Sequence, residues 1–237
     1  MKQTKLQQYL AGMRSGVPVI FGFVPVGIAF AIMARQAGFS VAQTCGMSLC
    51  VFAGASQMMA AGMYGQGAGL LAIIFATFIL NLRHLIMSTC VMNRMKDGGP
   101  AMRLLAAFGV TDESFALFTT EKEENCFLFY FLGMITVTYG SWNAGTFIGA
   151  IASDFLPAIV TASLGIALYA MFIGLLVPGL PGNGRLAALV ALTALCNTLL
   201  SGLMASSWAL IVSTLVCAFL GTFFVELEDT QEVTHEQ

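Results

Sequence analysis

The stretch AGLLAIIFATFIL, residues 68–80, followed by NLRH, residues 81–84, decides the class of this protein. Between Arg35 and Arg83 the sequence contains no Asp, Glu, Lys or Arg. A helix needs about 20 apolar residues to cross a bilayer, so this interval has room for more than one segment at membrane depth. Asn, Arg and His are costly to bury there and usually mark a pathway for a substrate, an ion or a proton.

The composition of the whole chain agrees with a membrane protein. Of its 237 residues 58% are hydrophobic and only 9% are charged, whereas a soluble domain has about 25% charged residues. The apolar runs are continuous, which favours helices over barrel strands with their alternating polarity. The net charge of −2 argues against nucleic-acid binding. The sequence therefore predicts an all-α, polytopic helical bundle in the lipid bilayer.

Seven hydrophobic segments, separated by charged residues or by Gly and Pro, give the predicted organisation. They are Ser15–Ala34, Val41–Met63, Ala68–Met92, Met102–Thr120, Cys126–Ile151, Pro157–Val177 and Leu186–Val225. The last is long enough for two helices joined near 201–207. We expect about six spanning helices plus re-entrant or broken segments. Residues 1–225 would form a single integral membrane transport domain, and residues 226–237 an acidic disordered tail.

The Lys and Arg residues predict which segments fail to cross. Lys/Arg-rich loops stay in the cytoplasm, which places the N-terminus and the loop from Arg94 to Arg103 on the same side. An even number of crossings must separate them, yet three hydrophobic segments lie between. We therefore expect Val41–Met63, interrupted at 54–57, to be re-entrant or broken, and Met102–Thr120 to end on the side where it begins. In the first segment, Pro18 and Pro25 allow either a kinked span or a broken helix.

The island at 81–84 supplies one half of the candidate site. On a helix Asn81 and His84 share a face, while Arg83 points well away from Asn81. The guanidinium of Arg83 suits a substrate carboxylate, His84 could relay a proton, and Asn81 would orient the ligand. The alternatives are structural: Arg83 pairs with a carboxylate of the fold or a lipid headgroup, and His84 is a packing residue.

A second island, residues 111–114, supplies the opposite charge. Asp112 or Glu113 would hold a substrate ammonium, and Asp112 is also a candidate for the proton relay, because a buried carboxylate is protonated more readily than an exposed one. Ser56 and Gln57 offer neutral hydrogen-bonding groups that would orient the ligand. The alternatives are surface carboxylates and polar side chains that hold helices together.

An enzymatic function is disfavoured. Ser56, His84 and Asp112 are the residue types of a nucleophilic triad, but the G-x-S-x-G motif is lacking. The six cysteines lie inside apolar runs without a C-x-x-C pair, which is typical of small buried side chains rather than metal ligands. We therefore predict no enzyme and no metal site.

Four stretches resemble a known family: GFS at 38–40, FAGASQ at 52–57, NLRH at 81–84 and GVTDESF at 109–115. They are similar to the AzlC-type large subunits of bacterial branched-chain amino acid exporters. The C-terminal half matches this family in length and hydropathy rather than in specific residues. The resemblance implies a multi-pass protein of the bacterial cytoplasmic membrane that exports branched-chain amino acids, with methionine as a further candidate substrate. It also implies a small AzlD-like membrane subunit as partner, and no cofactor.

The leading hypothesis is thus a secondary exporter whose site accepts a carboxylate, an ammonium and an apolar side chain. Two alternatives remain. One is an accessory or scaffold membrane subunit without transport of its own, and the other, less favoured, is an intramembrane hydrolase.

Overall fold

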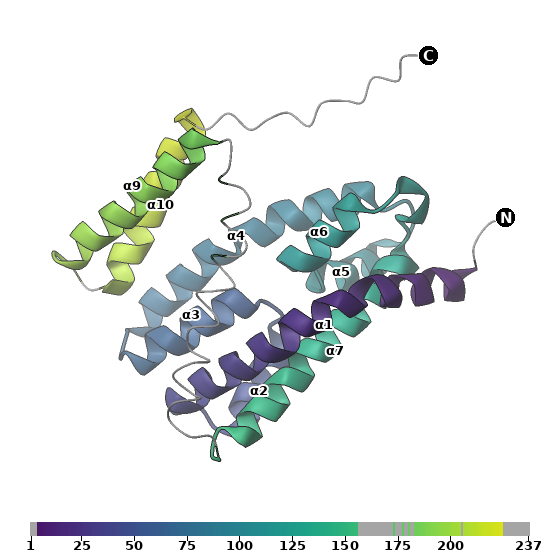
Figure 1. Ribbon diagram of the computed structural model, residues 1–237, viewed down its shortest axis with the longest axis horizontal. Coiled ribbons are helices and arrows are strands. Elements are labelled where there is room, and N and C mark those ends of the chain that lie inside the picture. The colour runs from purple at the N-terminus through teal and green to yellow at the C-terminus, as the bar shows by residue number, and fades with distance from the viewer. Residues whose placement is uncertain are drawn as a thin grey trace. The chain divides into compact units, whose positions relative to one another are not determined.

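The computed structural model describes residues 4–155, 173, 177, 180, 183–204 and 206–224. All regular structure in these ranges is helical (Figure 1), as the sequence predicts. The chain forms two compact units, Met1–Ala170 and Met171–Gln237, and each is described by itself. The prediction of a single transport domain stays a prediction, and its acidic tail at 226–237 lies outside the described residues.

The elements of the first unit alternate long helices with pairs of short ones. They are α1 (Lys5–Gln36), α2 (Val41–Cys50), α3 (Gly54–Gly65), α4 (Leu70–Arg94), α5 (Pro100–Phe108), α6 (Asp112–Thr120), η1 (Glu123–Asn125) and α7 (Leu128–Ala152). In the second unit, α9 (Gly184–Ser201) and α10 (Ser206–Phe224) form an antiparallel pair. Within that pair Ser213 Oγ donates to Asn197 Oδ1 at 3.4 Å. The predicted division of the last hydrophobic segment near 201–207 is therefore confirmed.

Helices α1 and α7 run side by side and parallel, and their glycines bring the two backbones into contact. A Cβ added at Gly12 would lie 1.8 Å from the carbonyl oxygen of Tyr130, and one at Gly149 would lie 2.6 Å from that of Ile28. The contacting positions rise together along both helices, so both helices point the same way (Figure 1). Small residues permit this closeness, which drives helix association in a bilayer through dispersion contacts.

Helix α1 is continuous despite its two prolines. Pro18 and Pro25 both lie inside the helix, so the alternative of a broken first helix is wrong. A proline removes one backbone hydrogen bond and crowds the preceding turn, but the long contact with α7 continues on both sides of the two prolines. At the start of the helix, Thr4 and Gln7 form a capping box that satisfies exposed N–H groups.

Helices α2 and α3, which we call hairpin 1, form a broken re-entrant segment. The ring of Phe39, before α2, and that of Tyr64, at the end of α3, have centroids 4.8 Å apart, so both ends of hairpin 1 lie together. The helices are interrupted at 51–53. The prediction of a re-entrant or broken segment is confirmed in its broken form, although the break precedes the residues at 54–57, which form the first turn of α3.

Helices α5 and α6, which we call hairpin 2, also return to their starting end. Arg103, near the start of α5, donates through Nη2 to the carbonyl oxygen of Met95 at 3.1 Å. Arg94 donates to the carbonyl oxygen of Glu121, which follows α6. Both ends of hairpin 2 therefore lie at the C-terminal end of α4, as predicted. The interruption falls at 109–111.

Glu121 fastens the base of hairpin 2 to the start of α7. Its carboxylate accepts hydrogen bonds from the Tyr130 hydroxyl, the Asn125 amide and the backbone N–H of Lys122. Burial raises the pKa of Glu121, but these hydrogen bonds outweigh burial and hold the pKa below its usual value. The carboxylate is thus maintained in its charged form at the end of the bundle where α1 begins.

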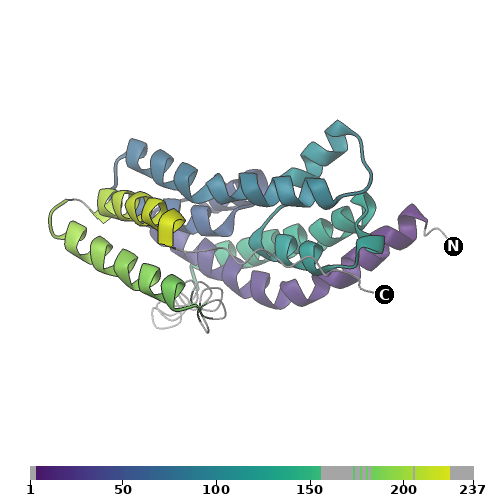
Figure 2. The ribbon, with the colours of Figure 1, turned by 90° about the horizontal axis from the view of Figure 1, so that it is seen from above.

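The two hairpins enter the first unit from opposite ends. Hairpin 2 starts at the end where Lys5 of α1 lies 5.1 Å from the ring centroid of Phe129. Hairpin 1 starts at the other end, where α1 and α7 finish. Figure 2 shows α4 along one side of the unit and α1 along the other, with the shorter helices between them. The two interruptions are consequently brought toward the middle of the unit.

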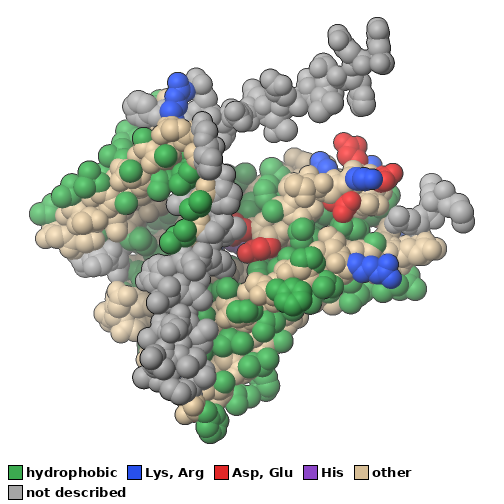
Figure 3. Space-filling view, viewed as in Figure 1, with side chains coloured by type: hydrophobic (Ala, Val, Ile, Leu, Met, Phe, Trp, Pro, Cys, Tyr) green, Lys and Arg blue, Asp and Glu red, His purple; other side chains and the backbone are tan. Residues whose placement is uncertain are grey.

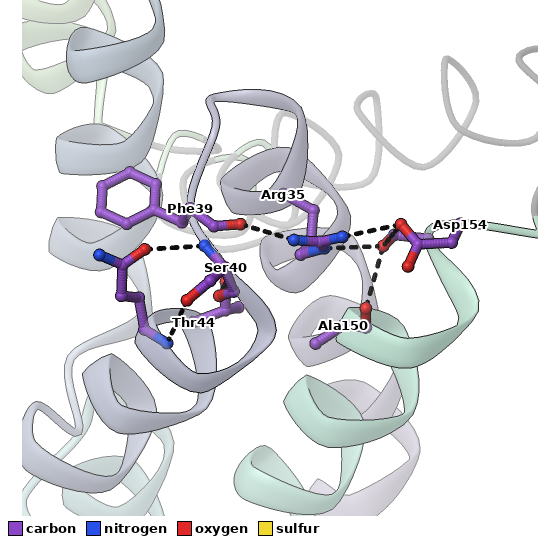
Figure 4. Close-up of polar contacts among 8 residues, drawn as sticks. Arg35, Phe39, Ser40, Thr44, Ala150 and Asp154 are labelled. Atoms are coloured by element: carbon purple, nitrogen blue, oxygen red, sulfur yellow. Dashed lines mark hydrogen bonds and ion pairs between the residues drawn. The ribbon is translucent and has the colours of Figure 1, made fainter.

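A polar cluster around Arg35 closes the end from which hairpin 1 enters (Figure 4). The Arg35 guanidinium pairs with Asp154 at 2.8 Å and donates to Ser153 Oγ at 3.3 Å, both just beyond α7. It also donates to the carbonyl oxygen of Phe39 at 2.9 Å. Ser40 then begins α2 through a capping box. One side chain of α1 therefore fixes both the end of α7 and the entry to hairpin 1.

Within the described residues, α1, α4 and α9 are long and apolar enough to cross a membrane. Helix α7 is as long as α4, carries no charged residue and lies against α1. The N-terminal start of α1 and the Arg94–Arg103 loop lie at the same end, which agrees with the predicted topology. The predicted segment Pro157–Val177 lies mostly outside the described residues, so the count of six crossings stays a prediction.

Candidate functional site

The polar island of α4 meets the tips of both hairpins within one helical turn. Asn81 Nδ2 donates to Ser56 Oγ in the first turn of α3 at 3.1 Å. Two residues further on, Arg83 Nη2 lies 3.0 Å from Asp112 Oδ2 at the start of α6. The two islands that the sequence singles out are therefore adjacent in space, and α4 joins them.

His84 contacts hairpin 2 as well. Its Nδ1 lies 3.0 Å from the carbonyl oxygen of Val110. A carbonyl oxygen can only accept, so Nδ1 carries the hydrogen and Nε2 is the ring nitrogen that can gain or lose a proton. In this arrangement any proton exchange at His84 takes place at Nε2.

Three buried polar atoms of this island have no hydrogen-bond partner within the described structure. They are Asn81 Oδ1, Arg83 Nε and His84 Nε2. A buried polar atom without a partner costs about 1–3 kcal/mol. Arg94 Nε and Arg103 Nε lack a partner in the same way, so the missing hydrogen bonds leave these groups open to a polar ligand but do not by themselves locate one.

The opposite side of the two tips is aromatic. The Tyr139 ring of α7 has its centroid 5.2 Å from that of Phe52, before α3, and 5.8 Å from that of Phe108, before α6. The Tyr139 hydroxyl donates to the carbonyl oxygen of Leu49 at 2.8 Å. Aromatic rings at these separations attract one another edge to face. Tyr139 thus joins both tips from α7.

Both interruptions follow the same pattern. In hairpin 1 a phenylalanine within the break, Phe52, faces Tyr139, and in hairpin 2 the one just before the break, Phe108, does so. In each, a polar residue four positions later faces α4, namely Ser56 in hairpin 1 and Asp112 in hairpin 2. The tips therefore lie between an aromatic side and a polar side. In Figure 3 an acidic patch lies apart from the charged end of the first unit, among hydrophobic side chains.

Gln57 occupies a different environment from its neighbour Ser56. It is fully buried; its Nε2 donates to Ser48 Oγ at 3.1 Å and its Oε1 accepts from Trp142 Nε1 at 3.2 Å. Ser48 in turn lies 2.8 Å from Thr146 Oγ1. Both functional atoms of the Gln57 amide are engaged, so this side chain fixes hairpin 1 to α7.

The first turns of α3 and α6 add electrostatic character. Helix N-termini carry partial positive charge and free N–H groups, which favour anions. Helix α3 has no side-chain cap, whereas α6 is capped by Thr111 and Ser114 and carries Asp112 and Glu113 in its first turn. Hairpin 1 thus offers groups for an anion and hairpin 2 groups for a cation.

The residues of the hydrolase alternative are not arranged as a triad. Ser56 Oγ donates to the carbonyl oxygen of Ala53, His84 contacts a backbone carbonyl, and Asp112 pairs with Arg83. Among the described residues no hydrogen bond joins Ser56, His84 and Asp112. The geometry gives no support to nucleophilic catalysis here.

The chain matches a known protein family over more than half of its length. The profile of the AzlC protein family matches residues 18–156, which include both hairpins and the island of α4. The chain belongs to the AzlC family. No solved structure matches it.

Curated relatives of this AzlC-family chain come from archaea and bacteria. An uncharacterized membrane protein of Archaeoglobus fulgidus is 35% identical over 76% of this chain and 80% of its own length. The inner membrane protein YgaZ of Escherichia coli is 29% identical over 90% and 88%. The branched-chain amino acid transport protein AzlC of Bacillus subtilis is 29% identical over 71% and 68%. The relatives support a membrane location and a role in membrane transport.

Proposed function

We propose that this chain is the large subunit of a secondary exporter that carries branched-chain amino acids, and also methionine, out of the cell across the cytoplasmic membrane. The observation that carries the proposal is the meeting of two broken hairpins between a polar turn of α4 and an aromatic side chain of α7. Broken helices at membrane depth are tolerated where they line a substrate pathway, and their half-helix ends bind charged groups. The name of the Bacillus subtilis relative supports the choice of substrate.

The chemistry of a branched-chain amino acid fits the groups that converge there. Its carboxylate would bind Arg83 and the N-terminus of α3, and its ammonium would bind Asp112 or Glu113. Asn81 and Ser56 would orient the charged end, and His84 would relay the coupled proton, with Asp112 as its alternative. Gln57 would act by positioning hairpin 1. The apolar side chain would lie toward Tyr139.

The proposal includes a partner. A small AzlD-like membrane subunit would assemble with this chain, and the bilayer would cover the remaining apolar surface. Helix α4 offers ample surface for either, because Leu70, Phe78 and Ile86 are among its strongly exposed apolar side chains.

Export from cells preloaded with labelled leucine, valine and methionine tests the function, measured with and without the small subunit. We expect efflux only when both subunits are present. Efflux that is independent of this chain would favour the accessory-subunit alternative and would contradict the proposal.

Variants of the ion pair test the site. Arg83→Gln and Asp112→Asn should each abolish export while the protein remains inserted and partner-bound, because each removes a ligand for one end of the substrate. The matched control is Glu124→Gln, which changes an exposed carboxylate of η1. If the double variant Arg83→Gln/Asp112→Asn recovers export, the pair is structural. Normal efflux in both single variants would exclude these residues from the site.

A further inference from the structure

The two hairpins differ in how their tips are held. The tip of hairpin 1 is fixed to α7 by Gln57, Ser48 and Thr146, all of which are fully buried. These groups satisfy one another. Pulling them apart without water would leave several buried polar groups unpaired. The base of hairpin 1 is held as well, because Arg35 binds both the entry to hairpin 1 and the end of α7.

The base of hairpin 2 is held by Arg94, Arg103 and Glu121, and its Val110 and Phe118 lie in the apolar core. The polar contacts at its tip, however, are weaker than those of hairpin 1. The tip of hairpin 2 is joined to α4 by the Arg83–Asp112 pair, whose side chains are 34% and 30% exposed, and by the His84 contact with Val110. Helix α5 buries only Ala106. Such partly exposed ion pairs are weak, because solvent screens them and they are easily replaced.

A zwitterion can replace this ion pair and still leave each of the two protein charges paired with an opposite charge. Its carboxylate can take the place of Asp112 beside Arg83, and its ammonium can take the place of Arg83 beside Asp112. Both protein charges stay paired during the exchange, so neither is left without a partner of opposite charge. A ligand with only one of the two charges would leave one protein charge unpaired.

We propose that hairpin 2 is the loading gate and that the Arg83–Asp112 pair is its latch, opened by a zwitterionic amino acid, while hairpin 1 stays fixed to α7. This inference rests on the proposed function and specifies how the same site admits its substrate. Hairpin 2 opens toward the end that carries Arg94 and Arg103. The Lys/Arg bias places that end in the cytoplasm, from which an exporter must load.

Two disulfide locks, each tying one hairpin to α7, provide a matched test. Ser48→Cys/Thr146→Cys replaces a pair whose oxygens are 2.8 Å apart. For hairpin 2 the pair is Gly109→Cys/Ile135→Cys. A Cβ at Gly109 would lie 2.2 Å from Ile135 Cδ1, and the second substitution removes that clash. Both pairs are introduced into the full-length chain with its six native cysteines, and the parent chain, oxidised identically, is the control.

The measurement is the rate of disulfide formation in membranes, followed on non-reducing gels with and without leucine. Leucine should slow the hairpin 2 lock by at least about threefold, because it shifts the population toward the open gate, and should leave the hairpin 1 lock unchanged. Leucinamide and 4-methylpentanoate, which each lack one charge, should have no effect. Oxidising the hairpin 2 lock should also stop leucine efflux, and a reductant should restore it.

Equal sensitivity of the two locks to leucine, or an effect of a singly charged analogue as large as that of leucine, would overturn the latch. Leucine efflux from the parent chain separates this failure from that of the proposed function. Without such efflux the proposed function itself is wrong. With efflux but with a hairpin 2 lock that ignores leucine, only the gate assignment is wrong.

Discussion

Replacing Gly133 of α7 by alanine should destabilise the first unit, because the methyl group has no room. A Cβ there would lie 2.0 Å from the carbonyl oxygen of Tyr9, which is 1.0 Å inside the 3.0 Å limit that real Cβ contacts keep. The obstacle is backbone, so α1 and α7 must separate along their contact. Overpacking of this kind costs about 1–3 kcal/mol, and the separation also weakens neighbouring dispersion contacts. We expect a loss of about 3 kcal/mol.

The matched control is Gly140→Ala on the same helix, where an added Cβ meets nothing within 4 Å. There alanine should be neutral or should stabilise by up to about 1 kcal/mol, because it favours the helix over glycine. Thermal unfolding of the purified protein in detergent, followed by tryptophan fluorescence, measures both variants. Equal melting temperatures for Gly133→Ala and Gly140→Ala would refute the close backbone contact.

Three further predictions follow from other contacts. Tyr139→Ala should raise the export of methionine relative to valine by about tenfold, measured by competitive efflux, because it enlarges the apolar side of the proposed site. The folded-state pKa of Glu121 lies below the ordinary 4.5. The contribution of Glu121 to stability is therefore full above pH 4.5 and is lost as the pH falls through the lower folded-state pKa. Glu121→Gln should flatten this acid dependence in thermal melts, and Glu124→Gln should not. Arg35→Gln should lower stability by about 1–2 kcal/mol and Asp154→Asn by less, in the same melts, since Arg35 also holds a backbone carbonyl.

Much of the fold follows from charge placement alone. The absence of charge between Arg35 and Arg83, together with the Lys and Arg residues at either end, is sufficient to predict a re-entrant segment before α4. The exact position of the break in hairpin 1 is harder to predict, because Gly54 lies in the first turn of α3 and not in the interruption itself. Local composition identifies such a break within a few residues, and tertiary contacts decide its position.

Some of the polar residues around the site can be predicted from the sequence, and others cannot. Arg83 and Asp112 attract notice because charge is rare at membrane depth, and their pairing was among the expected alternatives. Ser48, Thr146 and Trp142 are uncharged and lie inside apolar runs, so nothing local distinguishes them. Their role depends on contacts between segments about a hundred residues apart, which a single sequence does not reveal.

The sequence also carries a partial signal for the parallel contact of α1 and α7. Gly12 and Gly16 in α1, and Gly145 and Gly149 in α7, repeat the four-residue spacing that small residues adopt at close helix contacts. The spacing suggests that each helix has a close partner, but it does not say which helix that partner is.

Helix α7, the partner of α1 and of hairpin 1, is translated long after both, which has a consequence for biosynthesis. In the sequence, 118 positions separate Arg35 from Ser153, so at about 5–20 residues per second α7 emerges roughly 6–24 s after α1. Until then the interruption of hairpin 1 has no Trp142 or Thr146 beside it. Exposed backbone of that kind is not stable in lipid. We therefore expect hairpin 1 to enter the bilayer only after α7 has been translated.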